Sequence, residues 1–196
     1  MNKRASKLLL WLLLAAPLVY VVFAYATERL FYGEVVHITG ELSARLLIAA
    51  MTATPLTLML PGQPVSRWLM RHRRSFGVAS FAYAALHTLV YVERTGMLTD
   101  VIDEAVDPGY LTAWIALAGF PVLAATSNDA SVRWLKEGWK RLHRLVYLAA
   151  VLAFAHWVLV AFNPGAAYLH VGILAGLEAY RVWKQRRIRG AGRDAP

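Results

Sequence analysis

Four histidines lie inside or at the ends of long apolar runs, and this placement makes them the first candidates for chemistry: His87, His143, His156 and His170. An ionisable side chain inside a membrane segment is energetically costly, so it marks a functional site by default. His143 and His156 share the apolar stretch 139–162, in which a helix separates them by about 20 Å along its axis and by roughly 220° around it. They therefore cannot bind one compact metal site, and each needs a partner from another helix.

The composition is that of a membrane protein. The chain has 196 residues, of which 58% are hydrophobic, and a mean hydropathy of +0.44. Long apolar runs separated by charges indicate a polytopic membrane protein. Cysteine is absent from the sequence, which excludes disulfides, zinc–thiolate sites, iron–sulfur clusters and covalent c-type haem. Without a repeat of fixed period or a low-complexity linker, we expect a single domain over residues 1–196.

The apolar runs predict an all-α integral membrane protein, a bundle of six transmembrane helices. Each run has about 17 to 21 residues, enough to cross a hydrocarbon core of ~30 Å. The first run resembles a cleavable signal peptide, but its apolar core is long for one and further spans follow, so we expect it to be retained. The predicted spans are residues 8–26, 40–60, 75–92, 110–126, 145–162 and 166–183.

Lysine and arginine positions predict the orientation. The N-terminus, the loops 61–74 and 127–144 and the tail from Arg181 hold 18 of these residues, whereas the opposite loops hold only Arg29 and Arg94. Positive loops stay inside, so both termini are predicted to be cytoplasmic. The net charge of +9 is therefore a topology signal, and nucleic acid is excluded as a partner. The outer loop 93–108 is acidic, either as a docking surface or simply as a translocated loop. Residues 131–142 predict an amphipathic interfacial helix.

Depth in the membrane pairs two of the histidines. His87 lies thirteen residues beyond Arg74, and His156 lies twelve beyond Arg144, which places both about 18–20 Å from the inner edge. Two imidazoles facing each other across a helical bundle are the arrangement for bis-histidine haem. Zinc sites on helices usually show closer spacings such as H-x₃-H.

Arg45 and His170 are predicted to reach the same depth as this pair. An arginine at that level suits a haem propionate, which it contacts bidentately. Each residue also has a plainer interpretation. His170 is then a hydrogen-bond partner of a neighbouring helix, Arg45 a side chain that extends to the outer surface, and His87 with His156 an unliganded polar pair. The residues nearer the helix ends are then interfacial (His72 and His143) or a helix-end residue (His37).

Several short motifs also match a family. In chain order they are HITG (37–40), TATPL (52–56), RRSFGVASFAYAALH (73–87), ATS (125–127), WKRLHRLVY (139–147) and AHW (155–157). With these motifs the chain resembles the MsrQ (YedZ) proteins, haem-binding membrane subunits of a bacterial methionine sulfoxide reductase system, within the ferric-reductase-like transmembrane group. The resemblance spans nearly the whole chain.

The resemblance implies a b-type cytochrome of the bacterial inner membrane, with one or two haems. It implies electron transfer from the quinone pool to a periplasmic molybdopterin enzyme that reduces methionine sulfoxide in damaged proteins, and an association with flavin mononucleotide (FMN). By motif, the family's haem histidines correspond to His87, His143 and His156, and not to His72 or His170.

The role of His143 stays open at this point, because depth leaves it alone at the cytoplasmic edge. One interpretation is a second haem there, for which His72 is the nearby histidine. Another is a quinol or flavin site. The surrounding arginines would then either hold a flavin phosphate or only set the topology; they are Arg71, Arg73, Arg74, Arg141 and Arg144.

We therefore predict an electron-transfer subunit with haem ligands His87, His156 and His143 and with Arg45 beside the cofactor. No catalytic triad or acid–base dyad is evident that would make it a complete enzyme. The alternatives are a stand-alone transmembrane ferric or quinone reductase, and a haem-free transporter or assembly protein that uses the histidines as proton relays.

Overall fold

Every element of the computed structural model is a helix. The structure describes residues 3–191. Its elements are α1 (Lys3–Ala26), α2 (Tyr32–Met59), α3 (Pro64–Thr95), α4 (Leu98–Glu104), α5 (Pro108–Ala125), α6 (Asp129–Leu135), α7 (Glu137–Leu142), α8 (Leu145–Val160) and α9 (Gly165–Ala191). The predicted all-α fold class is confirmed.

Within residues 3–191, five segments are long and apolar enough to cross a membrane: Arg4–Ala26, Tyr32–Met59, Pro64–Thr95, Pro108–Ala125 and Glu137–Val160. They overlap the first five predicted spans, although α2 and α3 begin well before residues 40 and 75 and three of the predicted spans run one or two residues past the observed helix ends. Helix α9 has sufficient length at 27 residues, but Glu178 and Arg181 interrupt its apolar run, and it is not among the five. The sixth span therefore stays a prediction.

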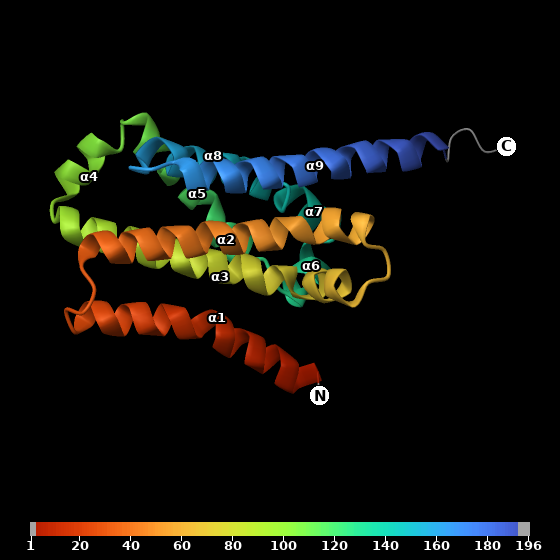
Figure 1. Cartoon of the computed structure of the whole chain (residues 1–196), viewed down its shortest axis with the longest axis horizontal. Coiled ribbons are helices and arrows are strands. Elements are labelled where there is room, and N and C mark those ends of the chain that lie inside the picture. The colour runs from red at the N-terminus through yellow and green to blue at the C-terminus, as the bar shows by residue number, and fades with distance from the viewer. Residues whose placement is uncertain (1–2, 192–196) are drawn as a thin grey trace.

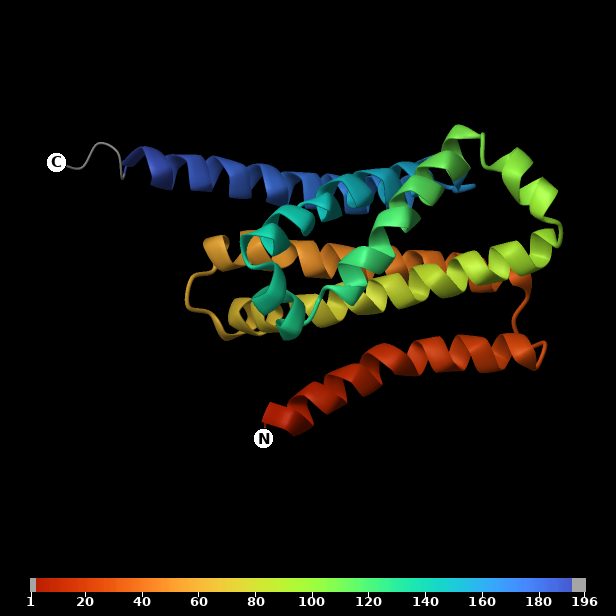
Figure 2. The same ribbon diagram turned by 180° about the vertical axis from the view of Figure 1, so that it is seen from behind.

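The helices run lengthwise side by side (Figure 1). Helices α2 and α3 form an antiparallel central pair, with α5 and α8 packed against each other and α9 against α2 and α8. Helix α1 lies along the outer side of this pair. The N-terminal end of α1, the α2–α3 loop, α6, α7 and the C-terminal part of α9 lie toward one end of the bundle, and α4 lies at the other (Figures 1 and 2).

A reciprocal pair of hydrogen bonds aligns α2 with α3. Ser43 Oγ donates to the Ser80 carbonyl at 2.9 Å, and Ser80 Oγ donates to the Ser43 carbonyl at 2.8 Å. Small hydroxyl residues allow close helix approach in membranes and satisfy each other's polar groups. Seven residues are about two helical turns, so moving seven residues along each antiparallel helix from this pair reaches Val36 and His87. The serine contact thus places His87 opposite the backbone at Val36.

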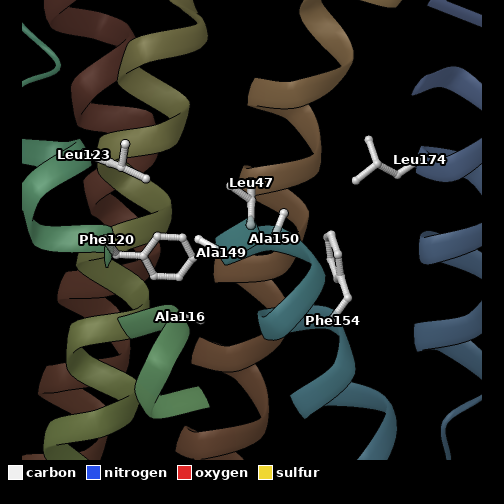
Figure 3. Close-up of a cluster of buried hydrophobic side chains, with 8 residues drawn as sticks. All are labelled: Leu47, Ala116, Phe120, Leu123, Ala149, Ala150, Phe154 and Leu174. Carbon is white, nitrogen blue, oxygen red and sulfur yellow. The ribbon is translucent and has the colours of Figure 1, made fainter. Parts of the chain in front are cut away.

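The main apolar core lies between α2, α5, α8 and α9. Figure 3 shows Phe120 and Leu123 on α5, Leu47 on α2, and Phe154 of α8 on the side toward α9. The cluster consists of Leu47, Ala116, Phe120, Leu123, Ala149, Ala150, Phe154 and Leu174. Two of its members, Leu47 and Phe120, line both the cavity at His87 and His156 and the cavity at His143.

The predicted single amphipathic helix over 131–142 is wrong. Residues there form two short helices, α6 and α7, divided at Lys136, whose φ of 48° is incompatible with a continuing helix. Asn128 caps α6 by accepting a hydrogen bond from the Ser131 N–H at 2.8 Å. The break lets α7 fold back, so that Trp139 Nε1 donates to the Thr126 carbonyl at 2.8 Å. This contact fixes the entry to α8.

Candidate functional site

Two histidines from different helices meet inside the bundle. His87 on α3 and His156 on α8 have ring centres 6.2 Å apart and ring planes at 83°. The pairing predicted from depth is therefore present in the structure, and their role as ligands stays a prediction.

Backbone carbonyls orient both rings. His87 Nδ1 lies 2.9 Å from the Val36 carbonyl oxygen, and His156 Nδ1 lies 2.9 Å from the Gly109 carbonyl oxygen. Because a carbonyl only accepts, each Nδ1 carries the proton and donates it. Each Nε2 is then the nitrogen with a free lone pair, which is the usual arrangement of a metal-binding histidine.

The separation of the two rings suits one metal between them. Two metal–nitrogen bonds of about 2 Å, with about 1 Å from each nitrogen to its ring centre, give roughly 6 Å. The residues present therefore fit an iron held by two imidazoles. Among residues 3–191, no group of three or more histidine, cysteine, aspartate or glutamate side chains could hold a metal ion.

Small residues make room beside the pair. A cavity of about 280 Å³ is lined by His87 and His156 together with mostly apolar side chains, including Gly40, Ala44, Ala84, Ala113, Ala116 and Ala153. At Gly40 an added Cβ would lie 3.1 Å from His87 Nδ1 and 3.2 Å from Cε1. A Cβ here would press the His87 ring away by a few tenths of an ångström, so glycine favours the close approach of the ring to α2 and to the Val36 carbonyl.

A second cavity of about 180 Å³ is lined by the same two histidines and is rich in aromatic rings. Tyr110 lies 6.4 Å from His156 between ring centres and stacks on Tyr91 at 5.5 Å. The Tyr91 hydroxyl donates to Glu104 of α4 at 2.6 Å. A chain of contacts thus joins the histidine pair to the acidic segment 93–108.

Arg45 lies outside the paired-histidine cavity. Its guanidinium pairs with Glu41 at 2.7 Å, and its side chain is 47% exposed. Glu41 and His37 line the cavity instead, with His37 Nε2 at 3.7 Å from Glu41. The proposed propionate contact of Arg45 stays a prediction, and the structure places a carboxylate between Arg45 and the cavity.

His143 belongs to a different, basic cavity of about 250 Å³ at the end of the bundle that holds α6 and α7. Its lining includes Arg73, Arg74, Lys140 and Arg144. His143 Nε2 lies 3.0 Å from Thr126 Oγ1, and the ring stacks on Trp139 with centres 3.9 Å apart. The Thr126 hydroxyl donates its proton to the Val122 carbonyl at 2.7 Å, so His143 Nε2 is the donor toward Thr126. His143 is thus protonated on the opposite nitrogen from His87 and His156.

The two remaining membrane histidines are not brought into either cavity. His72 lines a separate space of about 690 Å³ with Lys7 and Trp11 of α1, so it is not a partner of His143 in the same cavity. His170 Nδ1 lies 2.7 Å from the Ala166 carbonyl in its own helix. This hydrogen bond lies within α9, whereas the plainer interpretation of His170 had named a neighbouring helix as its partner; the ring meets α8 at Trp157, with ring centres 5.5 Å apart.

Sequence reasoning did not identify several residues that build these sites. Gly109 and Val36 act through backbone carbonyls, which carry no side-chain signal. Thr126 and Trp139 position His143 through a chain reversal that helical periodicity does not predict. The available signals were the glycines at residues 40 and 109, each opposite a histidine in the folded chain, and the ATS and WKRLHRLVY motifs, which contain Thr126 and Trp139.

These features define an all-helical, multi-pass membrane protein with a histidine pair in its interior. Residues 39–154 match the family described as ferric reductase like transmembrane component. Relatives include the "Protein-methionine-sulfoxide reductase heme-binding subunit MsrQ" of Xanthomonas campestris pv. campestris (strain B100), 39% identical over 80% of this chain and 72% of the relative. The protein of that name in Cronobacter sakazakii (strain ATCC BAA-894) is 33% identical over 88% of this chain and 87% of the relative.

The chain therefore belongs to the MsrQ family, within the ferric-reductase-like transmembrane proteins. The resemblance drawn from the sequence motifs is confirmed. No solved structure matches the chain significantly.

Proposed function

We propose that this protein is a b-type cytochrome of the bacterial inner membrane. In this proposal it passes electrons from the quinone pool to a periplasmic molybdopterin-containing methionine sulfoxide reductase. The observation that carries the proposal is the His87–His156 pair, 6.2 Å apart with each Nδ1 committed to a backbone carbonyl. A haem bound there supplies reversible one-electron chemistry. The relatives' name, with its haem-binding subunit of a methionine sulfoxide reductase, supports the same role.

The proposed topology has six spans, with both termini in the cytoplasm. The segments richest in lysine and arginine lie toward one end of the bundle (Figure 1), as positive-inside placement requires. The acidic segment with α4 then faces the periplasm, where the partner enzyme docks. Tyr91 and Tyr110 link that surface to the histidine pair.

The purified protein is expected to show a dithionite-reduced α band of a b-type cytochrome. The physical reason is that the Nε2 atoms of His87 and His156 are both free to hold a haem iron, which would supply the one-electron chemistry. Absorption spectra and a pyridine haemochrome assay measure the band and the haem stoichiometry. A protein free of haem after expression with sufficient iron would instead support a haem-free transporter that uses these histidines as proton relays.

A second measurement separates the proposed role from a stand-alone ferric reductase. The proposed role predicts reduction of the protein by a quinol, with no electron transfer to external ferric chelates.

We further propose that the basic cavity at His143 binds FMN in preference to a second haem. Its lining contains a single histidine, so bis-histidine ligation is not offered there. Arg73, Lys140 and Arg144 complement a phosphate, and Arg74, the fourth cation of the lining, pairs with Asp129 at 2.6 Å. His143 Nε2 already donates to Thr126, which leaves its Nδ1 as an acceptor for an N–H or O–H group of the ligand.

Replacement of Arg73 by alanine is expected to lower bound flavin by about tenfold or more, because a charge-assisted hydrogen bond contributes about 1.5–3 kcal/mol. Fluorescence of flavin released by heat measures the occupancy. Arg133→Ala is the matched control, since Arg133 is a cation of α6 outside the cavity lining. Equal flavin contents in the two variants would contradict the assignment. A loss of one of two haems in His143→Ala would favour the second haem instead.

A further inference from the structure

A groove between α8, α9 and Met51 of α2 is assigned no role by the histidine sites. It has a volume of about 900 Å³ and follows α8 from Tyr147 to Val158 and α9 from Val171 to Arg186. Since α8 and α9 are antiparallel, Phe154, Val158 and Val171 line one end. Tyr147, Glu178 and Arg181 line the other.

The polar end of the groove is buried and incompletely satisfied. The Glu178 and Arg181 side chains are 18% and 15% exposed and form an ion pair at 2.9 Å. Arg181 also donates to the Tyr147 hydroxyl. Within the described residues, Glu178 Oε1 and Arg181 Nε are buried without a hydrogen-bond partner. Buried polar atoms of this kind need partners, and these point to a ligand with both acceptor and donor groups.

The charges select the type of head group. Because Glu178 and Arg181 neutralise each other, the buried part of this end is uncharged overall and suits a neutral ring, while Arg186, the third charged residue of the lining, is exposed. The Arg181 Nε–H and the Tyr147 O–H donate to a carbonyl, and Glu178 Oε1 accepts from a hydroxyl. The apolar length of the groove accommodates an isoprenoid or alkyl tail.

The groove also lies next to the redox cavities, which follow one another through shared lining residues. Met51 and Tyr147 line both the groove and the basic cavity at His143. Leu47 and Phe120 line both that cavity and the paired-histidine cavity. The Met51 and Tyr147 side chains therefore lie between a ligand in the groove and the proposed flavin site at His143. This position suits an electron donor, whereas a purely structural lipid does not require it.

We infer that this groove binds the head group of a lipid-soluble quinone, with Glu178, Arg181 and Tyr147 as its polar anchors. The inference rests on the proposed function, because it names the site at which the electron donor binds. Oxidation of one quinol breaks two O–H bonds and yields quinone, two electrons and two protons. The electrons leave one at a time for the flavin or oxidised haem beyond Tyr147. Glu178 accepts the protons in turn and releases each to the solvent at the end of the groove where the exposed Arg186 lies.

The test uses the full-length protein in nanodiscs and a decyl benzoquinone as the probe. Ala175→Phe fills the groove from an exposed position that lines it, and we expect the Kd for the probe to rise about tenfold, equivalent to about 1.4 kcal/mol. Tyr147→Phe removes one donor, and we expect a rise of roughly two- to tenfold. Ile173→Phe is the matched control on the same helix, because Ile173 is exposed and outside the groove lining.

An azido derivative of the probe is expected to label peptides of α8 and α9. Probe binding that is unchanged in Ala175→Phe, or displaced equally well by excess phospholipid, would overturn the inference in favour of a lipid-filled groove. Haem content measured in the same samples separates the two proposals. Intact haem without groove-dependent probe binding contradicts only the quinone site, whereas absence of haem contradicts the proposed function.

Discussion

Replacement of either His87 or His156 by alanine is expected to abolish haem binding in the paired-histidine cavity. Each imidazole is one of the two nitrogen donors at this position, and their ring centres lie 6.2 Å apart. Losing a ligand should cost more than the roughly 10- to 100-fold in affinity that follows loss of an outer-shell partner. The α band of reduced-minus-oxidised spectra, normalised to protein, measures the effect.

His170→Ala is the control for this experiment. His170 is also a histidine of the membrane region, but its Nδ1 contacts the Ala166 carbonyl of its own helix, and it lines neither cavity of the pair. The control should retain full haem. Full haem in both His87→Ala and His156→Ala would show that the pair is only a polar contact between α3 and α8.

Gly40→Val is expected to give the second largest effect, a fall in haem affinity of roughly 10- to 100-fold, the range for loss of an outer-shell partner. The first added carbon alone would lie 3.1 Å from His87 Nδ1, and the branched side chain forces the ring away from α2. The hydrogen bond from His87 to the Val36 carbonyl is then lost, and with it the orientation of Nε2. Haem titration of the purified apoprotein measures the affinity.

The matched control is Gly172→Val in α9. An added Cβ at Gly172 meets nothing within 4 Å, so this variant reports the cost of a β-branched residue in a long helix without touching the site. Similar haem affinities in the two variants would mean that His87 does not depend on Gly40 for its position. A selective loss in Gly40→Val would extend the site to the HITG motif at residues 37–40.

The three proposed sites lie in series, so that electrons can pass from one to the next. The quinone groove, the basic cavity of His143 and the paired-histidine cavity each share lining residues with the next. The aromatic contacts of Tyr91 and Tyr110 continue toward α4. In the proposed topology, this order leads from the lipid-facing α8–α9 surface and the cytoplasmic edge to the periplasmic face.

Much of the architecture was predictable from the sequence. Apolar runs of membrane-spanning length identified the regions of the long helices, because the bilayer requires both the length and the helical conformation. Simple depth counting paired His87 with His156, because each helix has a constant rise per residue and both enter from a basic edge. The helix ends were less accurate, since α2 and α3 extend beyond the apolar run into polar sequence.

Tertiary structure decided what surrounds each histidine. Depth counting specifies a level along the membrane normal but not a direction around the helix, so Arg45 and His170 reached the right level without entering the cavity. The Ser43–Ser80 contact and Gly40 determine that His87 faces Val36. The reversal at Lys136 determines that His143 meets Thr126. Helical rise is a local property of the chain, whereas backbone carbonyl partners and shared cavities arise only when helices distant in sequence pack together.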